Sequence, residues 1–378
     1  MRFLWLGTYE SDYPRGRVLR DGLAELGHEV VECHAAVWER DRHKAGAFLG
    51  AASLAASAAR FGGGWARLLA GLRGAGAVDA VVAGYPAQPD MAPAWLAARH
   101  LRAPLVADLM VALGDTLAGD RGRASGVAAT ALTGFDRLAV RLADLVMTDT
   151  RANAAWCVAH LGADPRRTVA VPVGAEPLRF PAADPPPGPV QALFVGKLAP
   201  LHGLGVVLAA ARMPGVPPIH IVGAGQLDGW LRGELARGAP PGLVHTPWVP
   251  YERLGAELAR SHICLGVFGG SDKAGRVVPN KVWQAMAVGR PIVTADTPGV
   301  RKVLTHERDA LLVPPGDPRA LAAALARLAG DAALRDRLGR AARARYELLG
   351  RPARVAAPLV DAVRAITAPA NRAAASGA

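Results

Sequence analysis

Residues 269–291 read GGSDKAGRVVPNKVWQAMAVGRP, and they join a glycine-containing loop to an apolar segment with helical spacing. A helix that begins near Pro279 turns its unpaired backbone N–H groups toward that loop, and proline suits the first helical position because it has no N–H to lose. Asn280, Lys281 and Gln284 then share one exposed face. The other face is apolar and is expected to pack inward: Val282, Trp283, Ala285 and Met286.

Two cations flank the start of this helix. Arg276 lies in the loop and Lys281 lies in the first turn, where the helix dipole already favours an anion. The segment therefore predicts a phosphate site, and the competing interpretation is a surface helix with solvated charges.

The composition indicates a globular α/β protein. The chain has 378 residues, of which 51% are apolar, so two or three domains with sizeable cores are expected. Short apolar runs alternate with helix-like stretches, a rhythm typical of parallel sheets covered by helices. The expected strands are residues 2–6, 28–33, 79–83, 104–108, 145–149, 191–195, 219–222, 263–268, 291–295 and 310–313.

The order of these elements predicts two domains. The chain opens with a Rossmann-like strand, helix (17–26) and strand, but its first loop reads GTYESDYPRG instead of GxGxxG, which disfavours NAD. A first domain is expected over residues 1–184 and a second over 185–347, with the proline-rich residues 172–189 as a stiff linker.

The C-terminal part of the chain is expected to be helical. A pair of helices is predicted over residues 318–345. A further helix within residues 348–367 is expected to cross back to the first domain, and a disordered tail is expected over 368–378.

The charge pattern narrows the class of partner. The net charge is +12, and 39 of the 44 cations are Arg, so a base-composition bias in the coding sequence is a competing explanation for the charge. The chain has no five-residue block of like charge and no aromatic-and-basic stripe, so nucleic acid is not an expected partner. An anionic membrane surface stays open.

The sequence predicts a cytoplasmic protein. Its three cysteines are far apart and contain no CxxC pair, which favours reduced thiols, and the N-terminal run is too short and acidic for a secretory signal. A peripheral contact with the inner membrane face remains open through residues 45–72; a packed helix is the alternative interpretation. The candidate membrane residues are Phe48, Leu49, Trp65, Leu68 and Leu69.

Five motifs in register resemble those of the retaining GT-B glycosyltransferases of the family-4 (group 1) type. They are VPVGAEPLRFP at 171–181, FVGKLAPLHG at 194–203, IVGAGQLDGWL at 221–231, WVPYERL at 248–254 and QAMAVGRPIVT at 284–294. The resemblance implies two Rossmann-like, doubly wound parallel-sheet domains facing a cleft. It also implies that the second domain binds a nucleotide sugar, that the first binds the acceptor, and that transfer retains the anomeric configuration.

Three glycines and two cations are the expected contacts of the donor diphosphate. Gly196, Gly223 and Gly225 follow strand ends, where they let backbone N–H groups approach a pyrophosphate, although an ordinary tight turn explains the last two as well. By the resemblance, Lys197 stands in place of an Arg and His202 in place of a Lys that hold the diphosphate. A packing or cap role is the alternative for His202.

The family's paired glutamates, eight residues apart, correspond to Arg276 and Gln284. Gln284 keeps hydrogen-bonding capacity for the nucleotide ribose. Arg276 cannot imitate a carboxylate, so either it neutralises diphosphate charge or the sugar is read by other groups, with Asn280 and Asp272 as candidates. A catalytically inactive relative stays open. The remaining donor-binding candidate is Trp248, in the fourth motif.

The expected acceptor side lies in the first domain. Many relatives carry a DxH pattern after the fourth strand; here Asp108 keeps the acid, while Met110 occupies the place of the histidine. Asp108 is expected to act as an acid/base or sugar-binding group, with Lys281 and Arg276 as the other catalytic candidates. The acceptor-binding candidates are Thr8, Tyr9, Arg17 and Asp115, with helix capping as the alternative for Asp115.

No metal or cofactor is expected, because the chain contains neither a DxD triplet nor an HExxH pattern. The predicted activity is transfer of a sugar from a nucleotide-diphosphate donor to a glycan, lipid-linked or small-molecule acceptor. A GT-B sugar-nucleotide epimerase and a non-catalytic binding subunit remain as alternatives.

Overall fold

The computed structural model describes residues 1–37 and 51–368. The chain divides into two compact units, Met1–Pro172 with Pro352–Ala378, and Val173–Arg351. The observed boundary lies before the expected one at residue 184, because the segment that follows Pro172 packs with the second unit. The tail expected to be disordered falls outside the described residues apart from residue 368.

The first unit contains a parallel sheet with the strand order β2-β1-β3-β4-β5-β6. Phe3 of β1 lies opposite Val30 of β2 and Ala80 of β3, so β1 is an interior strand. The strands are β1 (Arg2–Gly7), β2 (Glu29–His34), β3 (Ala80–Ala83), β4 (Leu105–Asp108), β5 (Leu145–Thr148) and β6 (Thr168–Ala170).

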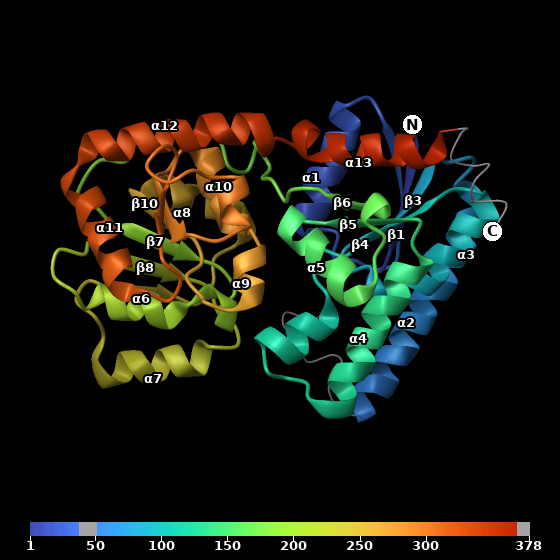
Figure 1. The fold of residues 1–378 in the computed structure, drawn as a ribbon, viewed down its shortest axis with the longest axis horizontal. Coiled ribbons are helices and arrows are strands. Elements are labelled where there is room, and N and C mark those ends of the chain that lie inside the picture. Colours follow the sequence, from blue (N-terminus) through green and yellow to red (C-terminus); the bar gives the residue numbers. More distant parts are fainter. Residues whose placement is uncertain (38–50, 369–378) are drawn as a thin grey trace. The chain divides into compact units, whose positions relative to one another are not determined.

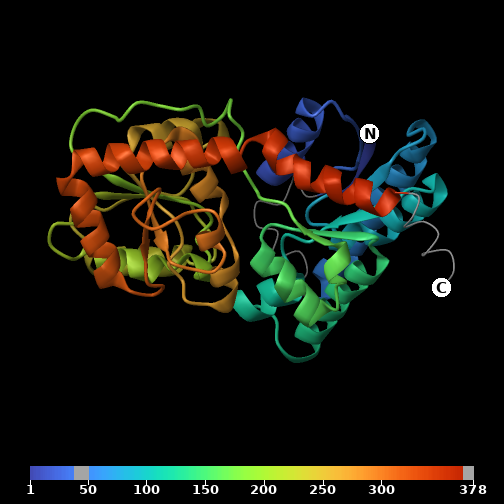
Figure 2. The same cartoon turned by 45° about the horizontal axis from the view of Figure 1, so that its top comes forward.

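Helices cover both faces of this sheet because alternate side chains of each strand point to opposite sides. Leu4 and Leu6 belong to the core beneath α3, whereas Phe3 and Trp5 belong to the core beneath α1 and α13. Figures 1 and 2 both show α13 lying beside α1. The helices are α1 (Pro14–Glu25), α2 (Ala51–Gly71), α3 (Met91–Leu101), α4 (Gly126–Leu142), α5 (Arg151–Leu161) and α13 (Pro352–Thr367).

The second unit contains a parallel sheet with the strand order β12-β11-β10-β7-β8-β9. The chain runs outward from β7 to β9 and then returns to the other side of β7 with β10, so the order reverses between β7 and β10. The strands are β7 (Ala192–Val195), β8 (Ile219–Val222), β9 (Val244–Thr246), β10 (Ile263–Leu265), β11 (Ile292–Ala295) and β12 (Leu311–Val313).

Helices again lie on both sides of this sheet (Figure 1). Helix α6 packs with α11, and α10 packs with α8 and α12. These helices are α6 (Leu204–Ala211), α7 (Asp228–Gly238), α8 (Leu254–Arg260), α9 (Asp272–Arg276), α10 (Asn280–Val288), α11 (Pro318–Gly330) and α12 (Ala332–Leu349). Short helical turns complete the chain: η2 (Leu72–Gly74), η3 (Gln88–Asp90), η4 (Asp115–Asp120), η5 (Pro165–Arg167), η6 (Pro200–His202), η7 (Tyr251–Arg253) and η8 (Val300–Lys302).

All ten expected strands are present, and two strands were not expected. Both β6 and β9 have three residues, and neither contains a fully buried one, so they lack the apolar run on which strand prediction depends. The expected helix pair over 318–345 is confirmed as α11 and α12. The prediction of a loop before Pro279 is partly wrong, because that segment contains the short helix α9.

The proline-rich segment has no helix or strand, as expected, but it is not the stiff linker between domains that the sequence predicted. Val173 and Phe180 are buried, and the hydroxyl of Tyr346 donates a hydrogen bond of 2.8 Å to the carbonyl oxygen of Ala175. The segment is therefore a packed part of the second unit.

The tract considered for membrane contact is partly packed where its side chains are described. Leu68 is 1% exposed, and the indole of Trp65 donates a hydrogen bond of 3.2 Å to Asp90. These two side chains agree with the packed-helix alternative, whereas Leu69 is 38% exposed, and Phe48 and Leu49 lie outside the described residues. None of the helices within residues 1–37 and 51–368 has both the length and the apolar character that a bilayer crossing requires.

Candidate functional site

The candidate site lies at the carboxyl edge of the second sheet, where the strand order reverses. In open α/β sheets this reversal leaves a crevice outside the strand ends, and ligands bind there. Strand β7 leads into the loop at Gly196, and β10 leads through α9 into the first turn of α10. The side chain that joins these two segments is that of Lys281.

Lys281 is buried, and its side-chain nitrogen has no hydrogen-bond acceptor among the residues that the structure describes. Its side chain is 6% exposed, and Nζ has no hydrogen-bond partner within the described part of the chain. Nζ lies 3.7 Å from the ring centroid of Phe194, and burial lowers the pKa of Lys281 well below its ordinary value. A buried ammonium with three donors and no acceptor is a site that an anion would complete.

The Lys281 ammonium lies close to the backbone of the loop after β7. Gly196 has a φ of +144°, and a Cβ there would lie 3.2 Å from Nζ of Lys281 and 3.3 Å from Cε1 of His202. The ring of His202 stands edge-on to that of Phe194, with centroids 6.0 Å apart. Gly196, His202 and Lys281, expected from sequence to serve one site, are thus brought together.

The expected exposure of the α10 residues is corrected by the structure. Helix α10 begins at Asn280, with Pro279 as its cap, as predicted. However, Lys281 and Gln284 are buried along with the apolar residues of the helix, and only Asn280 is half-exposed. The helix is enclosed by α8, α12 and the sheet, so its polar residues point into the protein.

The glycines of the third motif are needed first for packing between two loops. A Cβ at Gly223, whose φ is +139°, would lie 1.9 Å from the carbonyl oxygen of Gly196. A Cβ at Gly225 would lie 2.6 Å from the backbone nitrogen of Leu198. The loops after β7 and β8 can approach this closely only because both positions lack a side chain.

Arg276 ends helix α9 beside the start of α10. Its side chain is 7% exposed, and Nη1 donates a hydrogen bond of 2.9 Å to Asp272, whose side chain is 82% exposed. The hydroxyl of Ser271 accepts the N–H of Ala274 and so caps α9. The ion pair therefore places Asp272 at the surface and keeps the Arg276 chain packed.

The remaining donor candidates are more exposed. Lys197 is exposed in the loop after β7, so it is not enclosed as Lys281 is. Trp248 follows β9, and 67% of its surface is exposed, which leaves an aromatic face open to solvent.

A chain of hydrogen bonds that the sequence did not predict runs from Gln284 through Tyr251 to the buried carboxylate of Glu176. Nε2 of Gln284 donates to the Tyr251 hydroxyl at 3.5 Å, and that hydroxyl donates to Glu176 at 2.6 Å. Nε of Arg179 donates to the other oxygen of Glu176 at 3.0 Å. Tyr251 and Glu176 both lie inside quoted motifs, and that position was the signal available in the sequence.

In the first unit, Asp108 is enclosed by a structural ion pair. Asp108 and Arg15 are both fully buried, and Nε of Arg15 lies 2.9 and 2.7 Å from the two carboxylate oxygens. Arg15 also donates to the carbonyl oxygens of Thr148 and Val171. Burial raises the pKa of Asp108, while Arg15 opposes that shift. The expectation that Asp108 faces a substrate is therefore corrected: its carboxylate is used inside the unit.

Two other acceptor candidates are also engaged in the interior. Both the backbone N–H and the hydroxyl of Thr8 donate to Asp90, at 2.6 and 2.9 Å for Oδ2. The hydroxyl of Tyr9 donates to Glu32 at 2.7 Å. Burial raises the pKa of Asp90 to about 6, although the bonds from Thr8 and Trp65 oppose the shift. Thr8 and Tyr9 are thus fully buried and position the loop after β1.

Arg17 and Asp115 keep part of their surface accessible. Nη1 of Arg17 lies 3.6 Å from the exposed carboxylate of Asp12, and Asp115 begins the π-helical turn η4 while remaining half-exposed. Met110, at the position of the family histidine, is 8% exposed. Of the acceptor candidates, Arg17 and Asp115 are therefore the ones that reach the surface of the first unit.

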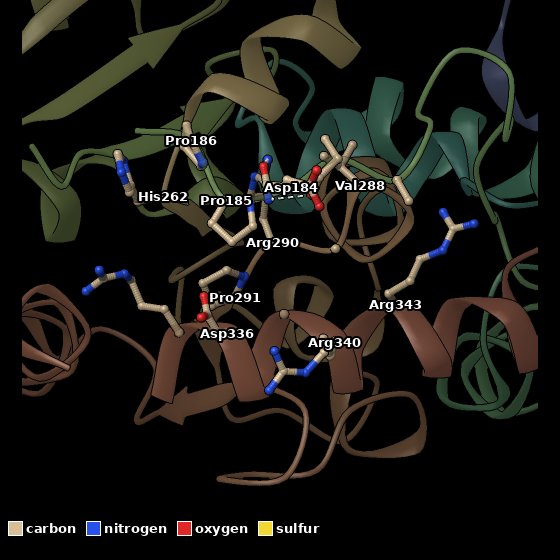
Figure 3. Close-up of a pocket in the computed structure, with 15 residues that line it drawn as sticks. Asp184, Pro185, Pro186, His262, Val288, Arg290, Pro291, Asp336, Arg340 and Arg343 are labelled. Carbon is tan, nitrogen blue, oxygen red and sulfur yellow. Dashed lines mark hydrogen bonds between the residues drawn. The ribbon is translucent and has the colours of Figure 1, made fainter. Parts of the chain in front are cut away.

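A cavity of about 360 Å³ lies at the opposite, amino edge of the second sheet. Arg340 and Arg343 of α12 line one side and Pro185 and Pro186 the other (Figure 3). Arg290 is 2% exposed and donates to four carbonyl oxygens, including those of residues 183 and 184. This guanidinium fastens the proline-rich segment to the sheet, so the cavity belongs to that packing and not to the carboxyl edge.

No cluster of three or more His, Cys, Asp or Glu side chains with metal-binding geometry occurs within the described ranges. The positive groups in this region include those of Lys281, Arg276 and Lys197.

Comparison with known proteins finds a family match within the second unit. Residues 189–331, less than half of the chain, match the model of the family described as glycosyl transferases group 1. The chain is 32% identical over 146 residues to the amylovoran biosynthesis glycosyltransferase AmsK of Erwinia amylovora. The aligned region covers 37% of this chain and 36% of AmsK. The chain is 30% identical over 213 residues to a D-inositol 3-phosphate glycosyltransferase of Geodermatophilus obscurus, covering 48% and 45%. The chain thus spans less than half the length of either relative.

Solved structures show the fold over nearly the whole chain. Sucrose-phosphate synthase from Thermosynechococcus elongatus matches with a TM-score of 0.74 at 17% identity, covering 97% of this chain and 98% of that one. HepE of Anabaena, solved in complex with UDP-glucose, matches with a TM-score of 0.68 at 15% identity, covering 97% and 100%. The expected GT-B fold, with two Rossmann-like parallel-sheet units, is confirmed.

Proposed function

We propose that this protein is a glycosyltransferase that moves a sugar from a nucleotide-diphosphate donor to an acceptor hydroxyl. The observation that carries the proposal is the buried ammonium of Lys281, which has no hydrogen-bond acceptor among the described residues and lies beside Gly196 at the strand reversal. A diphosphate placed there would receive hydrogen bonds from Lys281 and from the backbone of the glycine turns.

The same groups suit the chemical step. As the bond between sugar and phosphate breaks, negative charge grows on the departing diphosphate, and a preformed cation in a dry site stabilises that charge. Lys281 is the primary cation, with Arg276 and His202 as the further donors. We propose that the leaving phosphate takes the acceptor proton, so that the sugar keeps its anomeric configuration, and that these side chains serve in place of a divalent ion.

The comparisons support this proposal in different ways. The family match covers the unit that contains Lys281, and both curated relatives are named glycosyltransferases. HepE, which shares the fold, was solved with UDP-glucose. A nucleotide sugar is therefore the donor class to test first.

The test is a screen of nucleotide diphosphates followed by analysis of products. UDP, GDP and dTDP are added to the full chain and the shift in melting temperature is measured, since a ligand at a hundred times its Kd stabilises a protein by about 2.7 kcal/mol. Donor sugars of the binding base are then incubated with acceptors, and mass spectrometry identifies the product. Absence of binding to all three would contradict the proposal, and an altered sugar still attached to the nucleotide would indicate an epimerase instead.

We propose that the first unit binds the acceptor, a glycan, lipid-linked sugar or small molecule, with Arg17 and Asp115 as its surface contacts. We also propose a cytoplasmic location, supported by the free thiols of Cys33, Cys157 and Cys264, which suit a reducing compartment. Variants Arg17→Ala and Asp115→Ala should raise the KM for acceptor without changing donor affinity, and cell fractionation tests the location.

A further inference from the structure

We propose that Tyr251 and Glu176 act as positioning residues that fix the amide of Gln284, so that its carbonyl oxygen accepts hydrogen bonds from the hydroxyls of the donor's ribose. This inference rests on the proposed function. Gln284 lies on α10, four residues from the last residue of the helix and one turn beyond Lys281. Tyr251 belongs to the turn after β9, and Glu176 belongs to the proline-rich segment, so three separate parts of the unit meet in this network.

The orientation of the hydrogen bonds follows from the chemistry of the partners. A carboxylate only accepts hydrogen bonds, and both oxygens of Glu176 are engaged. Nε of Arg179 lies 3.0 Å from one oxygen, which makes Glu176 an ion-paired carboxylate. The other oxygen lies 2.6 Å from the hydroxyl of Tyr251, a length typical of an O–H donor bound to a charged acceptor.

Tyr251 has one hydroxyl proton, and Glu176 takes it. The hydroxyl oxygen of Tyr251 can then only accept a bond from Gln284, so the group that faces it at 3.5 Å must be the amide NH₂. The assignment of amide nitrogen and oxygen is therefore determined by Glu176, two bonds away. The carbonyl oxygen of Gln284 is turned to the other side, where it offers two lone pairs.

The network is rigid enough to hold this orientation. Glu176 and Gln284 are 5% and 4% exposed, so water does not compete strongly for their hydrogen bonds. The ring of Tyr251 stands edge-on to Phe180 at 5.7 Å, and the guanidinium carbon of Arg179 lies 5.5 Å from its centroid. The ring is thus held on two sides while its hydroxyl joins the two polar groups.

This arrangement explains how a neutral residue can serve at a position where the resembled family carries a glutamate. A carboxylate at 284 would compete with Glu176 for the single proton of Tyr251, and two buried like charges would repel each other. An amide whose carbonyl oxygen is fixed toward the ligand presents an acceptor to ribose hydroxyls without adding that charge.

The experiment compares ribose with deoxyribose in one protein. Calorimetry measures the Kd of UDP, GDP and ADP, each paired with its 2′-deoxy form, for the full chain and for Tyr251→Phe. We expect the wild type to prefer the ribose form of the nucleotide it binds by about fivefold to tenfold, the worth of one net hydrogen bond. In Tyr251→Phe the amide loses its fixed orientation, so the preference should fall to about twofold or less.

Two further variants separate positioning from general damage. Glu176→Gln gives Tyr251 a partner that can itself donate, so the direction of the chain is lost and the same fall in preference is expected. Tyr346→Phe removes a buried tyrosine hydroxyl bound to Ala175, next to Glu176, and should lower stability while leaving the preference unchanged.

Each outcome decides the question. An unchanged preference in Tyr251→Phe and Glu176→Gln, or equal weakening of both nucleotide forms, would overturn the positioning role and leave the proposed function intact. A wild type that binds nucleotides without preferring ribose would do the same. A wild type that binds no nucleoside diphosphate would overturn the proposed function, and the positioning role with it.

Discussion

A charged side chain is buried at the carboxyl edge of each sheet, but it is paired with an opposite charge in the first unit only. After β4 in the first unit, the carboxylate of Asp108 is enclosed together with the guanidinium of Arg15, and each charge is neutralised by the other. At the strand reversal in the second unit, the ammonium of Lys281 is enclosed without a hydrogen-bond acceptor among the described residues. The two sites occupy equivalent edges of similar sheets, so the difference lies in their side chains.

A paired charge and an unpaired charge have different consequences for the folded protein. Burying an ion costs free energy, and a partner in the protein offsets that cost permanently. An unpaired ion keeps the cost until a ligand of opposite charge arrives. The comparison therefore predicts that Asp108 contributes to the stability of the first unit and that Lys281 contributes to binding.

The largest effect is expected from breaking the buried ion pair between Arg15 and Asp108. Arg15→Met removes the guanidinium, keeps much of the volume and leaves Asp108 fully buried without its counterion. Removal of one partner of a buried pair costs about 3–5 kcal/mol, so the free energy of unfolding measured in urea should fall by that amount.

The double variant Arg15→Met/Asp108→Leu is the control for this prediction. It removes both charges, and replacement of a buried pair by apolar residues is often nearly neutral, so most of the lost stability should return. If Arg15→Met alone leaves stability unchanged, Asp108 is not held by this pair and its assignment to stability fails.

The next largest effect is expected from removing the unpaired charge of Lys281. Lys281→Met keeps the side chain over Phe194 but removes the charge, so the affinity for the nucleoside diphosphate should fall. A charge-assisted hydrogen bond in a dry site is worth about 1.5–3 kcal/mol, and calorimetry should find the Kd raised by about 10- to 150-fold.

Lys302→Met supplies a matched control for the loss of a lysine charge. Lys302 is an exposed lysine of the same unit, in the turn η8, so its loss changes the net charge equally. Its variant should bind the nucleotide as the wild type does. Equal weakening by both variants would mean that Lys281 acts only through the general field of the unit.

The same Lys281→Met variant should be more stable than the wild type when no ligand is present. Burial lowers the pKa of Lys281 below its ordinary value of 10.5, so the folded chain holds this proton less tightly than the unfolded chain. The resulting destabilisation is complete below the lowered pKa and vanishes above 10.5. Unfolding in urea should show a gain of about 1–3 kcal/mol near neutral pH, the cost of an unsatisfied buried group, and the gain should shrink as the pH rises toward 10.5.

A gain in stability together with a loss of binding would separate this cation from one that merely supports the fold. If Lys281→Met instead destabilises the empty protein at neutral pH, the ammonium has a structural partner and the contrast with Asp108 is lost.

The sequence predicted which segments form the candidate site of the second unit, but it did not predict which of their side chains are buried. Apolar periodicity and Pro279 were enough to place α10, and the glycine motifs were enough to place the loops after β7 and β8. The pattern did not show that Lys281 and Gln284 are buried, because the enclosure comes from α8 and α12, which are remote in the chain. Side-chain burial on a helix depends on such tertiary neighbours.

The same limit explains the residues that were misjudged or missed. Asp108 ends a strand, which favours a ligand role, but its partner Arg15 lies on another element more than ninety residues earlier, and no local pattern joins them. Glu176 and Tyr251 are likewise joined only by the fold. Pairs of polar residues that are distant in sequence are the part of a site that a single sequence cannot supply.

The smallest effect is expected from removing divalent ions. If Lys281, with Arg276 and His202, supplies the positive charge that stabilises the departing diphosphate, then no ion is needed at the open site. Turnover of the donor measured with EDTA should therefore stay within about twofold of turnover with added Mg²⁺, whereas a diphosphate site that depends on the metal for charge stabilisation would lose several kcal/mol of it. In Lys281→Met, added Mg²⁺ should not restore turnover, because the described residues hold no cluster of three or more His, Cys, Asp or Glu side chains that could bind the ion. If activity lost in EDTA is recovered when Mg²⁺ is added to the wild type, the positive charge of Lys281 is not sufficient for the reaction. The contrast between the paired charge of Asp108 and the unpaired charge of Lys281 would then have to include a bound metal ion.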